Sequence, residues 1–359
     1  MKKFYDITKM AKVEADYKYL MGGRNIGKSY QVKLHILKKV IEKDSEFIYL
    51  RRYKEDMKNQ LVTDYFGDMN IEEITDGKYK EIYTYQSTIY LINRDEKGKP
   101  CDKKLIGRAH CLSTAEHQKS IMYPRVEDVI FEEFIPESGM YLDREPSRLQ
   151  SYISTISRTR KITVWLVGNT ISKLCPYFSE WGLDKVNKQK LNTIDIYRRN
   201  IVVNTEDGVE ENQVIVAVER CAGKGILSKM AFGSAAEMIA NNEWSTDSKP
   251  LLDTNFIDEC EERYIMYVFW ANLKFKCTFL SYKGDYFWYV KPASGKLKID
   301  EISDTRLISD KITIHRKHTN SLTPLNPRES KVFKFLTDRK IFYSDNTTGT
   351  DFENVLANI

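Results

Sequence analysis

The stretch that decides the fold is MGGRNIGKSYQ, residues 21–31, where a glycine is followed after four residues by Gly-Lys-Ser. A short β-prone apolar run, 17–21, precedes it, and after it apolar side chains recur at helical spacing through 32–41. A glycine-rich loop that joins a strand to a helix is the setting of a phosphate-binding P-loop, whereas by itself it would be only a turn. The sequence therefore predicts a strand, a phosphate cradle and a helix, in that order.

Within this loop, each residue type suits a nucleotide. Glycines let backbone N–H groups turn inward around phosphate oxygens, and the helix N-terminus adds partial positive charge. We expect Lys28 to reach the β- and γ-phosphates and Ser29 to ligate Mg²⁺, so that ATP with Mg²⁺ is the predicted ligand. The predicted nucleotide-binding residues are Gly22, Gly23, Arg24, Asn25, Ile26, Gly27, Lys28, Ser29 and Tyr30.

A second apolar run, 126–131, ends in two adjacent acids, Glu132 and Glu133. A buried strand that ends in two acids beside a P-loop is the Walker B arrangement, in which the first acid holds the metal and the second activates water. The pair therefore favours hydrolysis over transfer to a bound acceptor. The first acid is usually Asp, and the extra methylene of Glu132 leaves its metal geometry open. Solvated glutamates at a strand end are the alternative.

A third apolar run, 162–168, leads to Asn169. In additional-strand ATPases a polar residue at this position lies between the two Walker strands and senses the γ-phosphate. Alone, the Gly-Asn-Thr sequence would indicate only a loop.

Two groups of basic residues accompany these motifs. Arg51 and Arg52 end a predicted strand, where they could contact phosphate, a neighbouring subunit or DNA, or simply be solvated. A predicted helix over 149–156 is followed by Arg158 and Arg160. These arginines could complete a neighbouring subunit's ATP site, or they could oppose the helix dipole.

Composition sets wider bounds. The 359 residues are 42% hydrophobic and 30% charged, which is typical of a globular protein, and no apolar run approaches the roughly 20 residues of a membrane span. Six cysteines without any CxxC pair indicate reduced thiols, and the N-terminus lacks the apolar core of a secretory signal. We therefore expect a cytoplasmic protein, and the formal charge of +5 permits an acidic partner.

The remaining chain is less specific. Residues 55–118 suggest an inserted lobe with a lysine-rich tip that could track DNA phosphates or be merely solvated. Residues 201–250 suggest a linker or lid. From 251 the chain is β-rich, and its first strand candidate, 263–279, contains no acid. Since two-metal cleavage needs clustered carboxylates, nuclease activity is predicted to be absent. The candidate DNA-binding residues are Lys54, Lys97, Lys99, Lys103 and Lys104.

Taken together, these motifs resemble the small packaging ATPases of phi29-type phages, relatives of terminase large subunits. The resemblance rests on GGRNIGKSY, FIYLRRYK, AEHQKSIMYPRVEDVIFEEFI, STISRTRK and VGNTISKLCPYF, which cover most of residues 15–200. It implies an additional-strand α/β ATPase domain with a mainly parallel sheet at 1–200. It also implies a smaller α+β domain at 251–359 that resembles a degenerate ribonuclease-H-like nuclease and binds nucleic acid.

The resemblance also implies residue roles and partners. Lys28, Asn169 and Glu133 fall on catalytic positions, Arg158 falls on the arginine finger, and Lys119 matches a lysine that acts across the subunit interface. Such proteins form a homo-oligomeric, pentameric ring at the portal of a procapsid in the host cytoplasm, and drive double-stranded DNA inward. Use of a scaffold RNA stays open, as does the choice between Arg158 and Arg160. A helicase-like or other nucleic-acid-remodelling ATPase is the main alternative, and Glu133 disfavours a small-molecule phosphotransferase.

Overall fold

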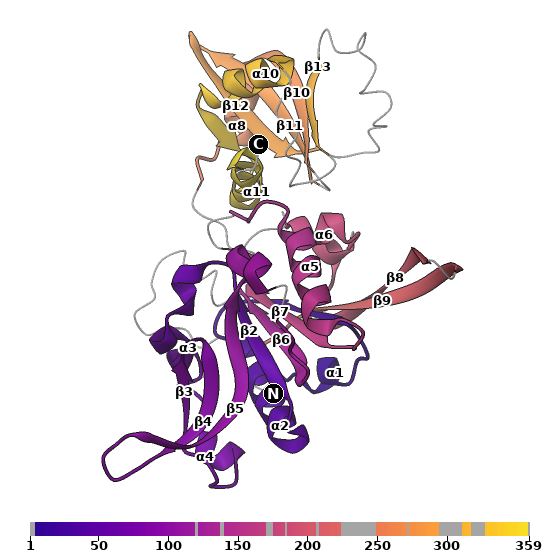
Figure 1. Ribbon diagram of the computed structural model, residues 1–359. Coiled ribbons are helices and arrows are strands. Elements are labelled where there is room, and N and C mark those ends of the chain that lie inside the picture. Colours follow the sequence, from indigo (N-terminus) through magenta and orange to yellow (C-terminus); the bar gives the residue numbers. More distant parts are fainter. Residues whose placement is uncertain are drawn as a thin grey trace.

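The computed structural model describes residues 4–118, 121–136, 140–169, 175–183, 185–205, 208–223, 249–270, 273–293, 311–316 and 327–357. These residues form a nine-stranded sheet and a separate five-stranded sheet, each with its own helices (Figure 1). The chain is therefore mixed α/β, as predicted, with a large and mostly parallel sheet followed by a smaller one.

The large sheet has the order β3-β4-β5-β2-β6-β7-β1-β9-β8. Its parallel strands are β1 (Tyr17–Gly22), β2 (Glu46–Arg51), β5 (Pro100–Cys111), β6 (Val126–Glu132), β7 (Thr163–Asn169) and β9 (Gly208–Arg220). Its antiparallel edge strands are β3 (Glu81–Tyr85), β4 (Thr88–Arg94) and β8 (Thr193–Thr205).

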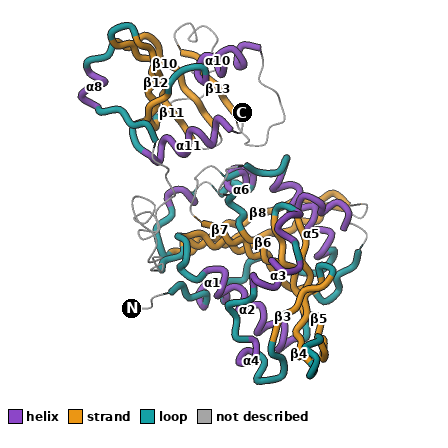
Figure 2. The backbone as a smooth tube through the Cα atoms, turned by 90° about the vertical axis from the view of Figure 1, so that its left-hand side faces the viewer, coloured by secondary structure: helices purple, strands orange, loops and turns teal. Residues whose placement is uncertain are grey.

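Helices cover both faces of this sheet because its central strands are apolar on both sides. Along β1, Tyr19 and Met21 join one buried cluster and Leu20 joins the other. The first cluster is closed by α5 (Glu145–Ser157) and α6 (Pro176–Glu180), and the second by α2 (Lys28–Lys43), α1 (Thr8–Ala11), α3 (Asn59–Tyr65) and α4 (Ile71–Ile74). Short 3-10 turns occur at η1 (Lys54–Met57), η2 (Leu112–Gln118) and η3 (Val186–Lys188). Figure 2 shows the purple helices on either side of the orange strands.

The parallel register brings the predicted motifs to one edge. Strand β7 pairs with both β1 and β6, and Gly22 lies opposite Asn169 while Glu132 lies opposite Val167. The strand that ends in Asn169 therefore lies between the two Walker strands, as predicted. Since ligands of open α/β sheets bind at the carboxyl ends of the strands, this edge is where a site is expected.

The region expected as an inserted lobe is continuous with the large sheet. β5 pairs with β2, β4 with β5 and β3 with β4, so the hairpin widens the sheet instead of forming a separate unit. Gln86 and Ser87 join β3 to β4, and both have positive φ, 46° and 59°, which is the geometry of a tight hairpin turn.

The large sheet also continues past residue 200, where the expected ATPase unit ended. β8 and β9 form a long hairpin whose base is β9 paired to β1, and whose far end projects from the sheet (Figure 1). The first part of the linker expected at 201–250 therefore belongs to strands of the large sheet, and Val216 and Val218 of β9 join the buried cluster on one face of that sheet. Residues 224–248 lie outside the described ranges.

The small sheet has the order β13-β10-β11-β12-β14. Its strands are β10 (Glu261–Trp270), β11 (Leu273–Tyr282), β12 (Asp285–Pro292), β13 (Lys311–Arg316) and β14 (Ile341–Tyr343), accompanied by α8 (Thr254–Asp258), α10 (Pro327–Thr337) and α11 (Asn346–Ala357). The expectation of a single strand over 263–279 was wrong: this acid-free stretch spans two antiparallel strands, and the first of them, β10, begins with Glu261 and Glu262. No helix in the described ranges is both long and apolar enough to cross a bilayer.

Candidate nucleotide-binding site

The loop between β1 and α2 has the backbone that a phosphate cradle requires. Gly27 precedes α2 with φ 93°, in the left-handed region that glycine adopts without strain. Asn25 is also left-handed, at φ 58°. A Cβ on Gly22 would lie 2.9 Å from the carbonyl oxygen of Cys221, so a side chain at this position would push the loop off the sheet. The strand, loop and helix predicted from residues 17–41 are thus confirmed.

Lys28 lies beneath this loop with only 5% of its surface exposed. Its Nζ donates to the carbonyl oxygens of Gly22 at 3.0 Å and Gly23 at 2.6 Å, and to Oδ1 of Asn169 at 3.2 Å. Within the described ranges no carboxylate forms an ion pair with it, and burial lowers the pKa of Lys28 to about 8. A buried ammonium among neutral oxygens is costly, so the group is suited to an anionic ligand.

The N-terminal segment supports the loop from outside. The backbone N–H of Tyr5 donates to the carbonyl of Ile26 at 2.8 Å, and its hydroxyl donates to Oε2 of the buried Glu219 at 2.7 Å. Phe4 lies beside Gly27. The cradle is therefore held between the end of β9 and residues that come before β1.

Glu132 is buried beside the cradle. Its Oε1 accepts a hydrogen bond of 2.6 Å from the hydroxyl of Tyr65, and the Ser29 hydroxyl also donates to this carboxylate. Burial raises the pKa of Glu132, and these hydrogen bonds, Arg51 and Lys28 oppose the rise. Burial, followed by the charge of Glu132, raises the pKa of the Tyr65 hydroxyl, which is thus a hydrogen-bond donor.

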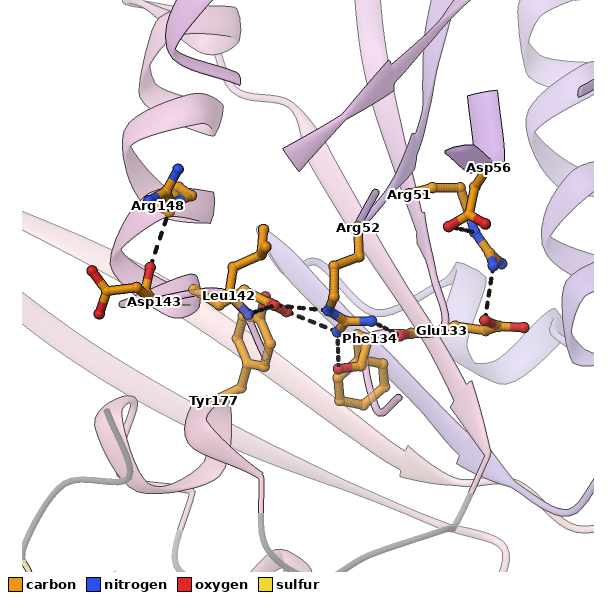
Figure 3. A network of polar contacts seen from close by, with 10 residues as sticks. Arg51, Arg52, Asp56, Glu133, Phe134, Leu142, Asp143, Arg148 and Tyr177 are labelled. Carbon is orange, nitrogen blue, oxygen red and sulfur yellow. Dashed lines mark hydrogen bonds and ion pairs between the residues drawn. The ribbon is translucent and has the colours of Figure 1, made fainter. Parts of the chain in front are cut away.

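Glu133 differs sharply from its neighbour. It has φ 55°, which is a strained conformation for glutamate, and its side chain is 58% exposed. Its Oε2 accepts from Nη2 of Arg51 at 2.8 Å, and Arg51 also contacts Asp56 (Figure 3). The two acids predicted from the sequence are therefore held by different partners, one inside the protein and one at the surface.

Arg52 follows Arg51 but is buried, with 4% of its side chain exposed. It forms two hydrogen bonds, of 2.7 and 2.8 Å, with the fully buried carboxylate of Glu145, and it also donates to the carbonyls of Glu133 and Phe134 at 2.9 Å (Figure 3). Tyr177 donates to the same carboxylate at 2.8 Å. Among the options that the sequence left open, Arg52 is thus a structural residue that clamps the turn carrying Glu133.

These groups surround one pocket of about 440 Å³. It is lined by Arg24, Asn25, Ile26, Gly27, Lys28, Ser29, Tyr30, Asp68, Glu132, Glu133, Ile135, Val167, Gly168 and Asn169. The donor set fits magnesium, which prefers oxygen ligands, since the Ser29 hydroxyl and the Glu132 carboxylate meet beside the cradle. Asp68 and Tyr65 were missed because no motif marks the segment from which they reach the site.

The two arginines near the end of α5 have different surroundings. Arg160 donates to the carbonyls of Val126, Tyr123 and Ile156 at 2.8, 2.6 and 3.1 Å. Arg158 ends the helix with φ 50° and ψ −106°, is exposed, and has no polar side-chain partner among the described residues. Among the described residues, the guanidinium of Arg158 is thus less engaged than that of Arg160. Lys119 lies outside the described ranges.

The candidate DNA-binding lysines do not form one group. Lys54 begins η1, near the β3–β4 turn, whereas Lys97 and Lys99 are exposed in the β4–β5 turn at the other end of β4. Lys103 is exposed on β5, and Lys104 pairs with Asp44 at 2.8 Å. Lys54 and the turn lysines therefore lie at opposite ends of β4, and their role in DNA binding stays a prediction.

In the small sheet and elsewhere in the described ranges, no three His, Cys, Asp or Glu residues are grouped closely enough to hold a metal ion.

The comparisons with known proteins bear on the large sheet and the chain beyond it. A family model of the podovirus DNA encapsidation protein (Gp16) matches residues 1–258.

Two curated relatives are similar in sequence. The DNA packaging protein of Bacillus phage phi29 is 31% identical over 195 residues, which are 54% of this chain and 54% of that protein. The DNA packaging protein of Bacillus phage B103 is 28% identical over 256 residues, 70% of this chain and 69% of that protein. The match thus spans about half the length of the phi29 relative.

Among solved structures, a chain of the bacteriophage phi29 viral genome packaging motor assembly matches with a TM-score of 0.51 at 18% identity. The match covers 99% of this chain and 99% of that chain. At this identity the likeness shows a shared fold.

Proposed function

The chain belongs to the podovirus DNA encapsidation protein (Gp16) family, and from this premise we propose that it hydrolyses ATP to drive double-stranded viral DNA into a procapsid. The observation that carries the proposal is the pocket in which a buried lysine with neutral partners faces Ser29, Glu132 and Asn169. A bound triphosphate would give the Lys28 ammonium the negatively charged partner that its neutral hydrogen-bond acceptors do not provide. Residues 1–220 form the motor part in this proposal, and residues from 251 the nucleic-acid-binding part.

The chain's own residues divide the work of hydrolysis. Backbone N–H groups of the cradle and Lys28 hold the phosphates, and Ser29 with Glu132 holds Mg²⁺. Bound magnesium would neutralise charge on the phosphate oxygens. Glu133 accepts a proton from the attacking water as general base, and its exposed side chain can turn from Arg51 towards the pocket to do so. Asn169, already bonded to Lys28, is placed to contact the γ-phosphate.

Arg158 is proposed to complete the pocket of a neighbouring subunit in a homo-oligomeric ring. Helix α5 starts at Glu145, beside the turn of Glu133, and its 13 residues carry Arg158 about 20 Å away. Arg160, just beyond, bonds the carbonyl of Val126 at the opposite edge of the sheet. Arg158 is therefore too far from its own pocket to act there. Lys119 and the pentameric ring at the portal vertex, in the host cytoplasm, belong to the same proposal.

Mixed assemblies test action between subunits. Blending wild type with Arg158→Ala should reduce DNA-stimulated ATP hydrolysis more steeply than the fraction of variant, because each variant subunit disables its neighbour. Arg148→Ala, which removes a half-buried arginine of the same helix that donates to the Asp143 carbonyl, is the matched control and should leave the rate unchanged. A loss strictly proportional to the Arg158→Ala fraction would show that the residue acts within its own subunit.

The form of DNA separates this proposal from the helicase-like alternative. Duplex should stimulate hydrolysis and should compete successfully against single strands, because packaging acts on double-stranded DNA. A clear preference for single-stranded DNA would favour the alternative. Incubating the protein with duplex and Mn²⁺ should leave the DNA intact, as expected for a small sheet that binds nucleic acid without cutting it.

A further inference from the structure

Glu132 departs from the aspartate that usually begins the Walker B pair, and the structure supplies a partner for its longer side chain. The Tyr65 hydroxyl donates to Oε1 at 2.6 Å, which is the distance of a charge-assisted O–H···O⁻ bond. The Ser29 hydroxyl donates to the same carboxylate. The carboxylate thus lies between a residue of the cradle and a residue at the end of α3.

Tyr65 itself is firmly held. Its ring stacks on that of Tyr49 with centroids 4.3 Å apart and 23° between the planes. The Nζ of Lys33, a buried lysine of α2, lies 4.5 Å from the centroid of the Tyr65 ring. The same Nζ donates to the Tyr65 carbonyl at 2.5 Å and pairs with Asp68. A hydroxyl fixed by stacking, a buried cation and its own backbone is preorganised to hold a carboxylate in one orientation.

We propose that Tyr65 is a positioning residue that orients Glu132 towards the magnesium of bound nucleotide. The extra methylene of glutamate adds a rotatable bond, and the hydrogen bond from Tyr65 removes that freedom at Oε1. The inference rests on the proposed ATPase function. The β3–β4 hairpin in turn supports the helix that carries Tyr65. Thr63 and Asn59 of α3 accept hydrogen bonds from the backbone N–H groups of Thr84 and Ser87.

Titration of the full chain with ADP, in Mg²⁺ and again in EDTA, tests the proposal without turnover. The ratio of the two affinities measures what the metal contributes. Tyr65→Phe keeps the ring and removes only the hydroxyl, so it should lower the ratio about tenfold and leave the EDTA affinity unchanged. Tyr19→Phe removes a buried hydroxyl that has no partner among the described atoms, and as the matched control it should leave both affinities unchanged.

A double-mutant cycle isolates the contact. The carboxylate of a Glu132→Asp variant falls short of the Tyr65 hydroxyl, so adding Tyr65→Phe to that variant should change the ratio less than twofold. An unchanged ratio in Tyr65→Phe alone, an equal loss in EDTA, or an undiminished effect in the Glu132→Asp background would each overturn the positioning role. If the ADP affinity of the wild type does not depend on Mg²⁺, the proposed ATPase function is contradicted as well. The wild-type titration therefore distinguishes a failure of the proposed function from a failure of the Tyr65 positioning role alone.

Discussion

The two edges of the large sheet both carry a charged hollow, but they are built on different principles. At the amino edge a pocket of about 700 Å³ is rich in ions that pair with one another: Lys39 with Asp128 at 2.7 Å and with Glu127 at 3.2 Å, and Arg125 with Glu46 at 2.6 Å. At the carboxyl edge the pocket is smaller, about 440 Å³, yet the hydrogen-bond partners of its buried Lys28 within the described ranges are all neutral.

The contrast teaches that the size of a hollow is a poor guide to function. Charges that satisfy one another inside the protein have nothing left for a ligand, whereas a buried charge on neutral oxygens is completed only by binding. We therefore propose that the carboxyl edge is the site and that the amino edge is scaffold.

The sharpest way to break this comparison is to exchange one lysine on each edge for methionine. Lys28→Met should lower kcat/KM for ATP on the order of 10³-fold, because it removes a preorganised cation from the phosphates. The free energy of unfolding should change little, because the three lost hydrogen bonds to neutral oxygens are offset by the removal of a buried charge, and no carboxylate of the described residues forms an ion pair with Lys28. ATPase rates and urea denaturation measure both quantities.

The amino-edge control is Lys39→Met. It leaves the buried carboxylate of Asp128 with the Trp165 Nε1–H but without its ion-pair partner, so stability should fall by about 1–3 kcal/mol. ADP affinity should stay within twofold of wild type. A loss of nucleotide binding in Lys39→Met, as large as that in Lys28→Met, would erase the distinction between the edges.

Glu133→Gln should separate chemistry from binding at the carboxyl edge. The amide cannot accept a proton from water, so turnover should drop about 10²-fold or more. The side chain is mostly exposed and lies at the pocket's rim, so ADP affinity should be unchanged. Parallel losses of kcat and ADP affinity would mean that Glu133 serves the nucleotide and not the water.

Adjacent arginines on β2 should affect stability differently. Arg52→Met leaves the fully buried carboxylate of Glu145 without its ion-pair partner, so the free energy of unfolding should fall by about 3–5 kcal/mol. Arg51→Met breaks a contact to an exposed glutamate, which should cost less than about 1 kcal/mol. Chemical denaturation of both variants gives the comparison, and equal costs would contradict the assignment of Arg52 as a structural clamp.

A pH dependence is expected at Lys18, a buried lysine on β1. Its Nζ donates to the carbonyl of Ala11 and lies 4.6 Å from the Trp165 ring centroid, and burial lowers its pKa to about 8. Between pH 8 and the ordinary lysine pKa the unfolded chain binds more protons than the folded one, so this residue makes stability rise with pH there. The rise should be smaller in Lys18→Met than in wild type, measured by urea denaturation at pH 8 and pH 10.

The parts of the site that lie within single motifs could be predicted from the sequence. The cradle, Glu132, Glu133 and Asn169 each follow a recognisable strand, and the parallel sheet brings those strand ends together. Partners that come from distant segments could not be predicted. Tyr65 reaches Glu132 across 67 residues and Tyr5 reaches Glu219 across 214, and neither pairing has a local pattern.

The extent of the large sheet and the distinction between Arg158 and Arg160 could not be predicted from the sequence either, because both depend on contacts with distant segments. β9 joins β1 although it follows the whole of the expected ATPase unit, 1–200, and sequence proximity does not reveal such a pairing. Arg158 and Arg160 are equivalent by composition, and only the carbonyls around Arg160 show that its guanidinium is already engaged.

The bond between Tyr5 and Ile26 has a practical consequence for handling the protein. Because residues ahead of β1 touch the cradle and Phe4 lies beside Gly27, an affinity tag or fluorophore attached just before Phe4 would lie close to the proposed nucleotide cradle. Labels for single-molecule or imaging work belong on exposed positions of the β8–β9 hairpin, such as Asn200, well away from this segment.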